Sequence, residues 1–456
     1  MVLPVRRLAP LLCLGLALSC RDGGTRRIDP GPTPPVPRCG DGTVDQGEDC
    51  DLSELAGATC QSLGFDTGQL LCDSSCHFQT SLCVKRCGNG ALDPGEACDG
   101  PLGVPACASW GANRCTATCT VDTTQCVTQA FEAAPALAMP YGGPALVGDL
   151  SPRGPGDLIM AVPARARLEA LPWVAQLGFD ATTGRKLSFQ RSPRQPGAAD
   201  LDGDGNQDLV AINDDGSIDA FLFTGTSFSP RTWPDAGCPG GHVVGRGHFT
   251  PDGGEGLVAA GCGDQLLVLT LDAARAVTAP ALAAAALGDL TGDGLTDLLT
   301  VDQANTAVLW VAPGFATDGG LPLTVPVTSV ALGDLDGDGD LDLAVASGND
   351  VKLLENTGLG FADRLTFTSS APHDVVIADF DLDGRPDVFW ATGDDVVVRR
   401  NRGGWQLAEF RATAGAGPRV STSVGDVDGD GDLDVAVTVS TGADSTLTFV
   451  VRNRAR

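Results

Sequence analysis

Acidic, glycine-containing stretches alternate with short apolar runs through most of the chain. The clearest example begins at Asp334, where DLDGDGDLD is followed at once by LAVA. In the same way, DLDGDGNQD at Asp200, DFDLDGRPD at Asp379 and DVDGDGDLD at Asp426 precede LVAI, VFWA and VAVT. Short apolar runs bounded by glycine and aspartate are typical of buried strands joined by tight turns. The pattern therefore predicts a protein built from many short strands.

The acidic stretches recur at a nearly constant interval. Another copy, DLTGDGLTD, begins at Asp289, and degenerate copies begin at Asp149 and His248, so that the seven copies start 41 to 51 residues apart. Each repeat reads as strand, acidic loop, strand, turn, strand, loop, strand, which is the content of one β-propeller blade. Seven copies predict an all-β fold, a seven-bladed β-propeller. A calcium β-roll is the alternative, but it needs tandem nonapeptides and not one acidic loop per repeat.

The last repeat has no fourth strand of its own. It contains LDVAVTVS (433–440) and TLTFVVRN (446–453), and the sequence then stops. The missing piece lies upstream, since AFEAAPALAMPYGGPALVGDL (130–150) aligns with GFADRLTFTSSAPHDVVIADF (360–380). Within a propeller spanning residues 129–456, we therefore expect residues 129–137 to supply the outer strand of the last blade. Such closure removes exposed sheet edges.

Each acidic loop places oxygen ligands at fixed positions. Counted from the first aspartate, carboxylates stand at positions 1, 3, 5 and 9 and glycine at position 6, whereas position 7 varies. Hard oxygen donors on a tight loop suit Ca²⁺ better than Mg²⁺ or the softer metals. An EF-hand would need a glutamate at position 12 and flanking helices, but position 12 here lies in the apolar run. The alternative is a solvated acidic turn, in which four close carboxylates would repel one another.

The D-x-D-x-D-G-x-x-D loop in a β repeat resembles the FG-GAP/VCBS family, which includes the propeller of integrin α chains. The resemblance covers residues 129–456 and implies structural calcium, bound by the side chains at positions 1, 3, 5 and 9 and the carbonyl at position 7. The four implied sites are Asp200, Asp202, Asp204, Asn206 and Asp208; Asp334, Asp336, Asp338, Asp340 and Asp342; Asp379, Asp381, Asp383, Arg385 and Asp387; and Asp426, Asp428, Asp430, Asp432 and Asp434. A fifth, weaker site comprises Asp289, Asp293, Leu295 and Asp297, because Thr291 stands at position 3.

The N-terminal residues have the features of an export signal. Two arginines precede the apolar run LAPLLCLGLAL (8–18), which is too short to span a bilayer. The small residue and cysteine that follow it resemble the bacterial lipobox, which implies removal of residues 1–19 and acylation of Cys20. An ordinary signal peptide is the alternative. Arg21 follows the cysteine, which by the same resemblance implies the outer membrane, and the proline-rich residues 20–38 are expected to form a disordered tether.

Twelve cysteines form two sets of six in which the first gap and the last two gaps are the same, which indicates a duplicated module at 39–83 and 87–126. Six cysteines in so short an exported segment predict a disulfide scaffold with three bridges, although the spacing leaves their pairing open. The sets are Cys39, Cys50, Cys60, Cys72, Cys76 and Cys83, and Cys87, Cys98, Cys107, Cys115, Cys119 and Cys126. The pattern resembles cysteine-rich repeats of exported myxobacterial proteins, a resemblance that implies no activity.

Other interpretations of the cysteine-rich modules remain open. Zinc is the alternative to disulfides, but Cys-x-x-Cys is absent from the sequence and His77 corresponds to a threonine in the second module. The matching acidic residues of the two modules, such as Asp51 and Asp99, suit either a calcium ion or turn formation. Cys238 and Cys262 lie in the repeat with the poorest acidic loop, and a disulfide between them is expected to staple that repeat.

Charge and motifs limit the classes of function. A net charge of −28 excludes a nucleic-acid binder that works through a basic face. The sequence has no G-x-S-x-G, phosphate loop or His-x-x-x-His pair, so we predict a protein that is not an enzyme. By the resemblance, we expect a surface-anchored binding or adhesion propeller with an extracellular protein or polysaccharide ligand, in contact with a membrane only through its lipid anchor. The alternatives are a lectin-like or polysaccharide-processing propeller and a passive coat lipoprotein.

Overall fold

The computed structural model describes residues 39–455, except for 64, 66, 85–86, 93–95, 106, 108, 128–129, 151–154, 176, 239, 252–254, 261, 263–264, 279–281, 324, 359, 416 and 443–444. The expected signal peptide (1–19), the tether (20–38) and the acylated Cys20 lie outside the described residues. Within the described part of the chain, no helix is long and apolar enough to cross a membrane. The chain divides into two compact units, one ending at Arg86 and one beginning at Cys87.

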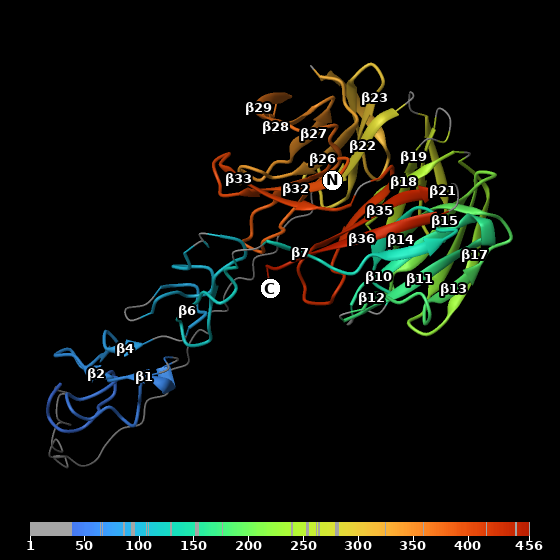
Figure 1. Ribbon diagram of the computed structural model, residues 1–456. Coiled ribbons are helices and arrows are strands. Elements are labelled where there is room, and N and C mark those ends of the chain that lie inside the picture. The colour runs from blue at the N-terminus through green and yellow to red at the C-terminus, as the bar shows by residue number, and fades with distance from the viewer. Residues whose placement is uncertain are drawn as a thin grey trace, which may run out of the picture. The chain divides into compact units, whose positions relative to one another are not determined.

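The first unit contains the first cysteine-rich module (Figure 1). It has one 3-10 turn, η1 (Gln61–Leu63), and two short antiparallel ladders. In these ladders β1 (Thr67–Gly68) pairs with β4 (Cys83–Val84), and β2 (Leu71–Cys72) pairs with β3 (Phe78–Gln79). Its disulfides are Cys39–Cys76, Cys50–Cys72 and Cys60–Cys83. With so few ladder hydrogen bonds, the disulfides are the main constraint on this fold.

The second cysteine-rich module opens the second unit and repeats the connectivity of the first. Its ladder consists of β5 (Arg114–Cys115) and β6 (Val121–Asp122). Its disulfides are Cys87–Cys119, Cys98–Cys115 and Cys107–Cys126. In both modules the first cysteine pairs with the fifth, the second with the fourth and the third with the sixth. The structure therefore gives the pairing that the spacing had left open.

The rest of the second unit is a ring of seven antiparallel sheets, which confirms the predicted seven-bladed β-propeller. Within blades 2 to 6, the spatial order of the four strands follows the chain. Blade 1 comprises β9 (Ala145–Gly148), β10 (Asp157–Val162), β11 (Arg167–Val174), β12 (Gly178–Phe179) and β13 (Arg185–Ser188), with the 3-10 turn η2 (Pro163–Arg165). Blade 2 comprises β14 (Pro193–Ala199), β15 (Asp208–Asn213), β16 (Ser217–Phe223) and β17 (Phe228–Gly237). Blade 3 comprises β18 (His242–Gly247), β19 (Gly256–Ala260), β20 (Gln265–Leu269) and β21 (Ala274–Thr278).

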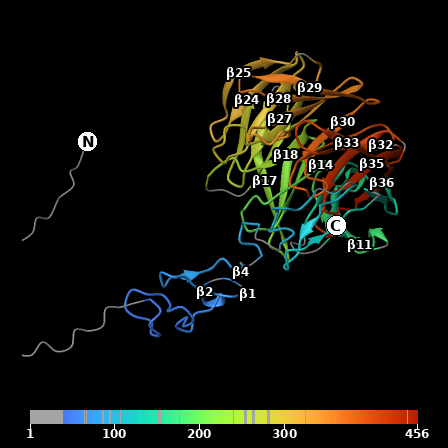
Figure 2. The same ribbon diagram turned by 90° about the vertical axis from the view of Figure 1, so that its left-hand side faces the viewer.

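The remaining blades continue around the ring, and their strands run from yellow through orange to red (Figure 2). Blade 4 comprises β22 (Leu282–Gly288), β23 (Asp297–Asp302), β24 (Thr306–Val311) and β25 (Ala316–Pro322). Blade 5 comprises β26 (Ser329–Gly333), β27 (Asp342–Ser347), β28 (Asp350–Asn356) and β29 (Phe361–Thr368). Blade 6 comprises β30 (His373–Ala378), β31 (Asp387–Ala391), β32 (Asp395–Asn401) and β33 (Leu407–Thr413). Blade 7 comprises β34 (Arg419–Gly425), β35 (Asp434–Gly442) and β36 (Ser445–Asn453), followed in space by β7 (Phe131–Ala133) and β8 (Leu137–Pro140).

Blade 7 joins the two ends of the ring. Its outer edge is formed by β7 and β8, which both pair with β36, so the segment that completes the blade is two short strands extending to Pro140. On the inner side, the hydroxyls of Ser421 and Ser423 accept the N–H groups of Ala145 and Val147 in blade 1, both at 2.9 Å. Residues from before the first blade thus hold the last one in place.

The core lies between neighbouring blades. All residues of the second strand are buried in β10, β15 and β31, as expected for apolar runs covered on both faces. Between blades 5 and 6, for example, Leu353 and Trp390 belong to one apolar cluster. An isolated blade could not bury both faces, so the blades stabilise one another in the closed ring.

Candidate functional site

The acidic loops occupy the same place in their blades, between the first and the second strand. The five acidic loops are residues 200–208, 289–297, 334–342, 379–387 and 426–434, in blades 2, 4, 5, 6 and 7. The degenerate loops 149–157 and 248–256 take this place in blades 1 and 3. Because the blades share one strand order, the loops gather on one face of the ring. The topology therefore brings together the predicted metal ligands of each repeat.

Backbone hydrogen bonds to the first aspartate fold each acidic loop. In blade 5, Asp334 Oδ1 accepts the N–H of Gly337 at 2.7 Å, and Oδ2 accepts the N–H of Gly339 at 3.0 Å. Both glycines have a positive φ, +87° and +96°, a conformation that costs glycine little. The carboxylate of Asp338 accepts the N–H of Asp340, at position 7, at 3.0 Å. The corresponding bonds to positions 6 and 7 recur in the loops that begin at Asp200, Asp289, Asp379 and Asp426.

The aspartate at position 9 crosslinks its blade. In blade 5, Asp342 is fully buried, and its two oxygens accept the N–H of Leu335 in the loop and of Asn356 at the end of the third strand, both at 2.9 Å. The equivalent residues Asp208, Asp297, Asp387 and Asp434 make the same pair of bonds. The sequence assigned these residues to metal binding alone, and their structural role was missed. Even the degenerate loop of blade 1 keeps one such bond, from Leu150 to Asp157 at 3.3 Å.

Burial makes several of these carboxyl groups hard to ionise in the absence of a cation. It is the main cause that raises the pKa of Asp208 and of Asp342 to about 6 and that of Asp434 to about 8, and neighbouring aspartates add to the effect. Burial and then Asp338 raise the pKa of Asp336. In the weaker fifth loop, burial acts to raise the pKa of Asp289, but backbone N–H groups outweigh it and lower that pKa. The buried position-9 carboxyl groups of blades 2, 5 and 7 would therefore be stabilised in their ionised form by a bound cation.

The donor set of the acidic loops fits calcium. Carboxylate oxygens of positions 1, 3 and 9 lie within 4.8 Å of one another in two groups, Asp200 with Asp202 and Asp208, and Asp334 with Asp336 and Asp342. The position-5 side chains Asp204 and Asp338 are not part of these groups. All donors are hard oxygens on a tight loop, the combination that Ca²⁺ prefers. These residues would hold the ion, and the ion would neutralise carboxylates that otherwise repel one another.

Two acidic loops contain an internal counter-charge that the sequence analysis missed. In blade 6, Arg400 forms ion pairs with Asp381 and Asp383, at positions 3 and 5. In blade 7, Arg452 lies 3.4 Å from Asp428 at position 3. The signal was present in the sequence, where an arginine precedes the last asparagine in DVVVRRN (395–401) and TLTFVVRN (446–453). These two loops therefore differ in charge from those of blades 2 and 5.

The degenerate loops are held by side chains instead of a carboxylate cluster. The N–H of position 1 donates to the side chain at position 8 of the following blade, from Asp149 to Gln207 at 2.8 Å and from His248 to Thr296 at 3.1 Å. The disulfide Cys238–Cys262 starts after β17 of blade 2 and ends after β19 of blade 3. The disulfide thus connects two adjacent blades, whereas the sequence analysis placed both cysteines within a single repeat.

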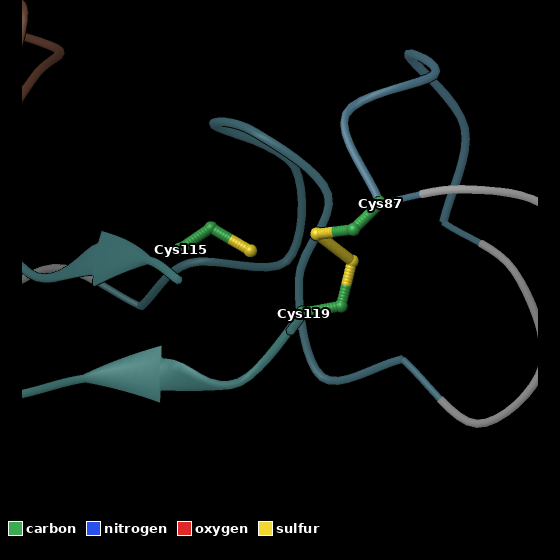
Figure 3. A group of neighbouring side chains, drawn as sticks. All are labelled: Cys87, Cys115 and Cys119. Atoms are coloured by element: carbon green, nitrogen blue, oxygen red, sulfur yellow. A yellow bond between two sulfur atoms is a disulfide. The ribbon is translucent and has the colours of Figure 1, made fainter. Parts of the chain in front are cut away.

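The cysteines of the modules are paired with one another. Figure 3 shows the Cys87–Cys119 disulfide with the Cys115 sulfur beside it, and Cys115 itself pairs with Cys98. Sulfurs in disulfides are not available as the thiolate ligands that a zinc site needs. The buried carboxylate of Asp99 accepts the N–H groups of Gly88 and Gly90, and Asp51 does the same in the first module. This geometry favours turn formation over a metal role for the matching aspartates.

Comparison with family models identified repeats in the second half of the propeller. Residues 289–345, 334–390 and 379–437 match the model of the FG-GAP-like repeat. The matched residues include four of the five acidic loops, whereas the loop at 200–208 lies outside them. The comparison with curated proteins returned no match.

Solved structures with the same fold were also found. Two crystal structures of BBS1N in complex with ARL6DN, one soaked with mercury and one with lead, have TM-scores of 0.50 and 0.52 to this chain. Each match has 12% sequence identity and covers 72% of this chain and 98% of the other. Identity this low supports the fold and nothing further. The protein therefore carries FG-GAP-like repeats in a seven-bladed β-propeller that follows a disulfide-rich region.

Proposed function

We propose that this protein is a calcium-stabilised, non-catalytic binding propeller, exported and lipid-anchored through Cys20 at the bacterial outer membrane or cell surface. The observation that carries the proposal is the convergence of carboxylates at positions 1, 3 and 9 on loops of all-oxygen donors, where burial raises the pKa of the position-9 residues Asp208 and Asp342. Disulfides are typical of proteins in oxidising compartments, in keeping with export. A rigid ring that presents loops on one face is suited to binding an extracellular protein or polysaccharide.

The calcium proposal is tested by counting ions. Elemental analysis of the purified protein should find several calcium ions per chain, and a chelator should lower the melting temperature. A ligand present at about 1,000 times its Kd adds about 4 kcal/mol of stability, so several sites together should shift the melt by more than about 10 °C. A chain free of calcium, with an unchanged melt in chelator, would contradict the proposal and leave the loops as solvated turns.

A groove in the second unit is a candidate site for the ligand. It has a volume of about 640 Å³ and lies between the second cysteine-rich module and the loop 379–387 of blade 6. Arg114, Asn113 and Arg385 contribute polar side chains to its lining, as does Asp383, which lies 3.6 Å from Arg385, and Val104 contributes an apolar one. Two arginines on the wall of a groove in so acidic a protein would favour an acidic polysaccharide over a neutral one.

The groove is tested with defined polymers. In calcium, the protein should bind polygalacturonate in preference to neutral dextran, and replacing both arginines, Arg114→Ala with Arg385→Ala, should weaken that binding at least tenfold. The matched control replaces two exposed arginines outside the groove, Arg191→Ala with Arg411→Ala. Equal binding of the two polymers, or an equal effect of both pairs of substitutions, would remove this groove as the site.

A lectin-like or polysaccharide-processing propeller is the alternative function. One pocket between blades 1 and 2 is lined by Phe189, Phe221 and Asp219, and the rings of the two phenylalanines lie 5.0 Å apart. Another, between blades 6 and 7, is lined by Phe131 and Phe410. Their linings differ, whereas a lectin with one site per blade would repeat them. Release of reducing ends from a polysaccharide by the purified protein would favour the processing function.

A further inference from the structure

Arg400 is a buried cation in the interior of the second unit. It lies on β32, and its side chain is 1% exposed. Its Nε forms the ion pair with Asp381, and one Nη2–H points to Asp383 Oδ2 at 3.4 Å. Its remaining Nη hydrogens are donated to backbone carbonyls of the second cysteine-rich module, to Cys107 at 2.9 Å, to Ser109, and to Gly111 at 3.3 Å. The four Nη hydrogens thus have four acceptors.

Blade 5 carries the opposite charge at the equivalent place. The residue after Arg400, Asn401, donates its N–H to the position-9 aspartate of blade 6, as Asn356 does in blade 5. Glu355, which precedes Asn356, therefore corresponds to Arg400. In blade 5 a glutamate stands beside a loop of five carboxylates, whereas in blade 6 a guanidinium contacts two carboxylates of its own loop. A loop that already holds a guanidinium would repel a divalent cation at the same oxygens.

The loop of blade 6 is also shaped around the module. Its position 4, glycine in the other acidic loops, is Leu382, which has a φ of +59° and packs against the cluster that contains Trp110. Trp110 is fully buried, its ring lies 4.7 Å from that of Phe410, and its Nε1–H donates to Asn453 at 2.6 Å. The segment 107–111 is thus held by Arg400 on one side and by the apolar cluster of blades 6 and 7 on the other.

We propose that the guanidinium of Arg400 takes the place of the metal ion at the loop 379–387 and binds residues 107–111 of the second module to that loop. Between blades 5 and 6, the charge at this position of the third strand decides whether the loop binds an ion or a segment of the second module. The second module is then a fixed part of the propeller. The inference rests on the proposed function, because it assumes that the loops of other blades bind calcium.

The test compares matched aspartates at position 3. Calcium bound per chain is measured by elemental analysis for the native protein, Asp336→Asn and Asp381→Asn. Asp336→Asn should lose one ion per chain, and Asp381→Asn should lose none. Loss of one ion from Asp381→Asn as well would overturn the proposal. A native chain that binds no calcium would overturn the proposed function together with this inference, and that result is distinct because the native protein itself would be ion-free.

A reciprocal substitution tests the charge at the third strand. Glu355→Arg, which places a guanidinium beside the loop of blade 5, should remove one ion per chain, whereas Glu355→Gln should keep it. Among the residues that the structure describes, the ion-pair partner of Glu355 is the partly exposed Arg364, so the substitution should not prevent folding. A full complement of calcium in folded Glu355→Arg would contradict the proposed exclusion.

Amide hydrogen exchange tests whether Arg400 holds the second module. In Arg400→Met, amide hydrogen exchange in residues 107–111 should become at least tenfold faster. Arg452→Met is the matched control on blade 7, because Arg452 pairs with Asp428 and Glu132 and not with the module. Unchanged exchange in folded Arg400→Met would show that Arg400 does not hold the module.

Discussion

The two cysteine-rich modules share one disulfide connectivity but differ in what else stabilises them. The segment CQSLG (60–64) of the first corresponds to CASWG (107–111) of the second. Leu63 is 39% exposed, whereas Trp110, at the same place, is 0% exposed and lies in the core shared with blades 6 and 7. The first module belongs to a compact unit of its own, and the second belongs to the unit that contains the propeller.

The difference shows how a duplicated, disulfide-held module becomes part of a larger domain. The disulfides fix the backbone of each module. One substitution of leucine by tryptophan then supplies a large apolar side chain with a polar N–H, which is suited to insertion between two blades. The same disulfide scaffold can thus form a separate unit or become part of the propeller core, depending on Trp110 and on Arg400, which binds the segment around it.

Deletion of whole modules should give the largest effect. Removal of residues 87–127 uncovers the apolar cluster around Trp110 and takes away three acceptors of Arg400, so the unfolding free energy of the propeller should fall by at least about 4 kcal/mol. Removal of residues 39–86 should change it by less than about 1 kcal/mol. Urea unfolding of both truncated chains, followed by circular dichroism, gives the comparison. Equal losses would show that the modules do not differ in this way.

Single substitutions at the matched position should reproduce the contrast. Trp110→Ala should lower the unfolding free energy of the second unit by about 3 to 5 kcal/mol, because it empties a buried site among aromatic rings. Leu63→Ala should cost less than about 0.5 kcal/mol, since the side chain is already partly exposed. Calorimetry of both variants measures the effect, and a small loss in Trp110→Ala would refute the assignment of this residue to the core.

The two units should also differ in the pH dependence of their metal-free stability. Burial is the main cause that raises the pKa of Asp381 to about 7 and that of Asp434 to about 8, near the second module. Because these values lie above the unfolded value of about 3.9, the folded state binds more protons in between. The stability contribution is therefore present in acid and is lost as the pH rises through about 7 to 8.

In chelated protein, the melting temperature of the second unit should fall by several degrees from about pH 5 to about pH 8. The first module should show no such fall, because the pKa of its Asp73 is shifted the other way, lowered by the backbone N–H groups of His77 and Ser75. Thermal melts over this range test the difference. Added calcium should reduce the slope and leave only the part that comes from Asp381, whose loop holds Arg400 in place of an ion. A slope that persists unchanged in saturating calcium would argue against the acidic loops as its source.

The smallest effect is expected from removing one hydrogen bond at the junction. Trp110→Phe keeps an aromatic ring but loses the Nε1–H that Asn453 accepts. Asn453 Oδ1 still accepts the N–H of Arg454 at 2.8 Å, so the cost should be only about 1 kcal/mol. This corresponds to a fall of about 2 to 4 °C in the melting temperature for a domain of this size. A loss as large as that of Trp110→Ala would mean that the hydrogen bond outweighs the packing.

Much of the fold could be read from the sequence because its signals repeat. The strands and the acidic loop of each repeat are patterns of neighbouring residues, and seven copies of the repeat fix the number of blades. The closing segment could be found because residues 130–150 align with residues 360–380. The loop residues could be found in the same way. The double role of Asp342 could not, because its partner Asn356 comes from another strand, and neither residue differs in type from a plain metal ligand or turn former.

The sequence by itself thus determined the class of fold, the number of blades, the duplicated cysteine-rich modules and the positions of the acidic loops. Only the tertiary structure decided the disulfide pairing and the connection of blades 2 and 3 by Cys238–Cys262. It also decided the contacts by which Trp110 of the second module and Arg400 of blade 6 join the module to the propeller. The physical reason is distance along the chain. The pattern of a repeat lies in neighbouring residues and is visible in the sequence. Arg400, by contrast, contacts Ser109 only after closure of the ring has brought blade 6 and the second module together.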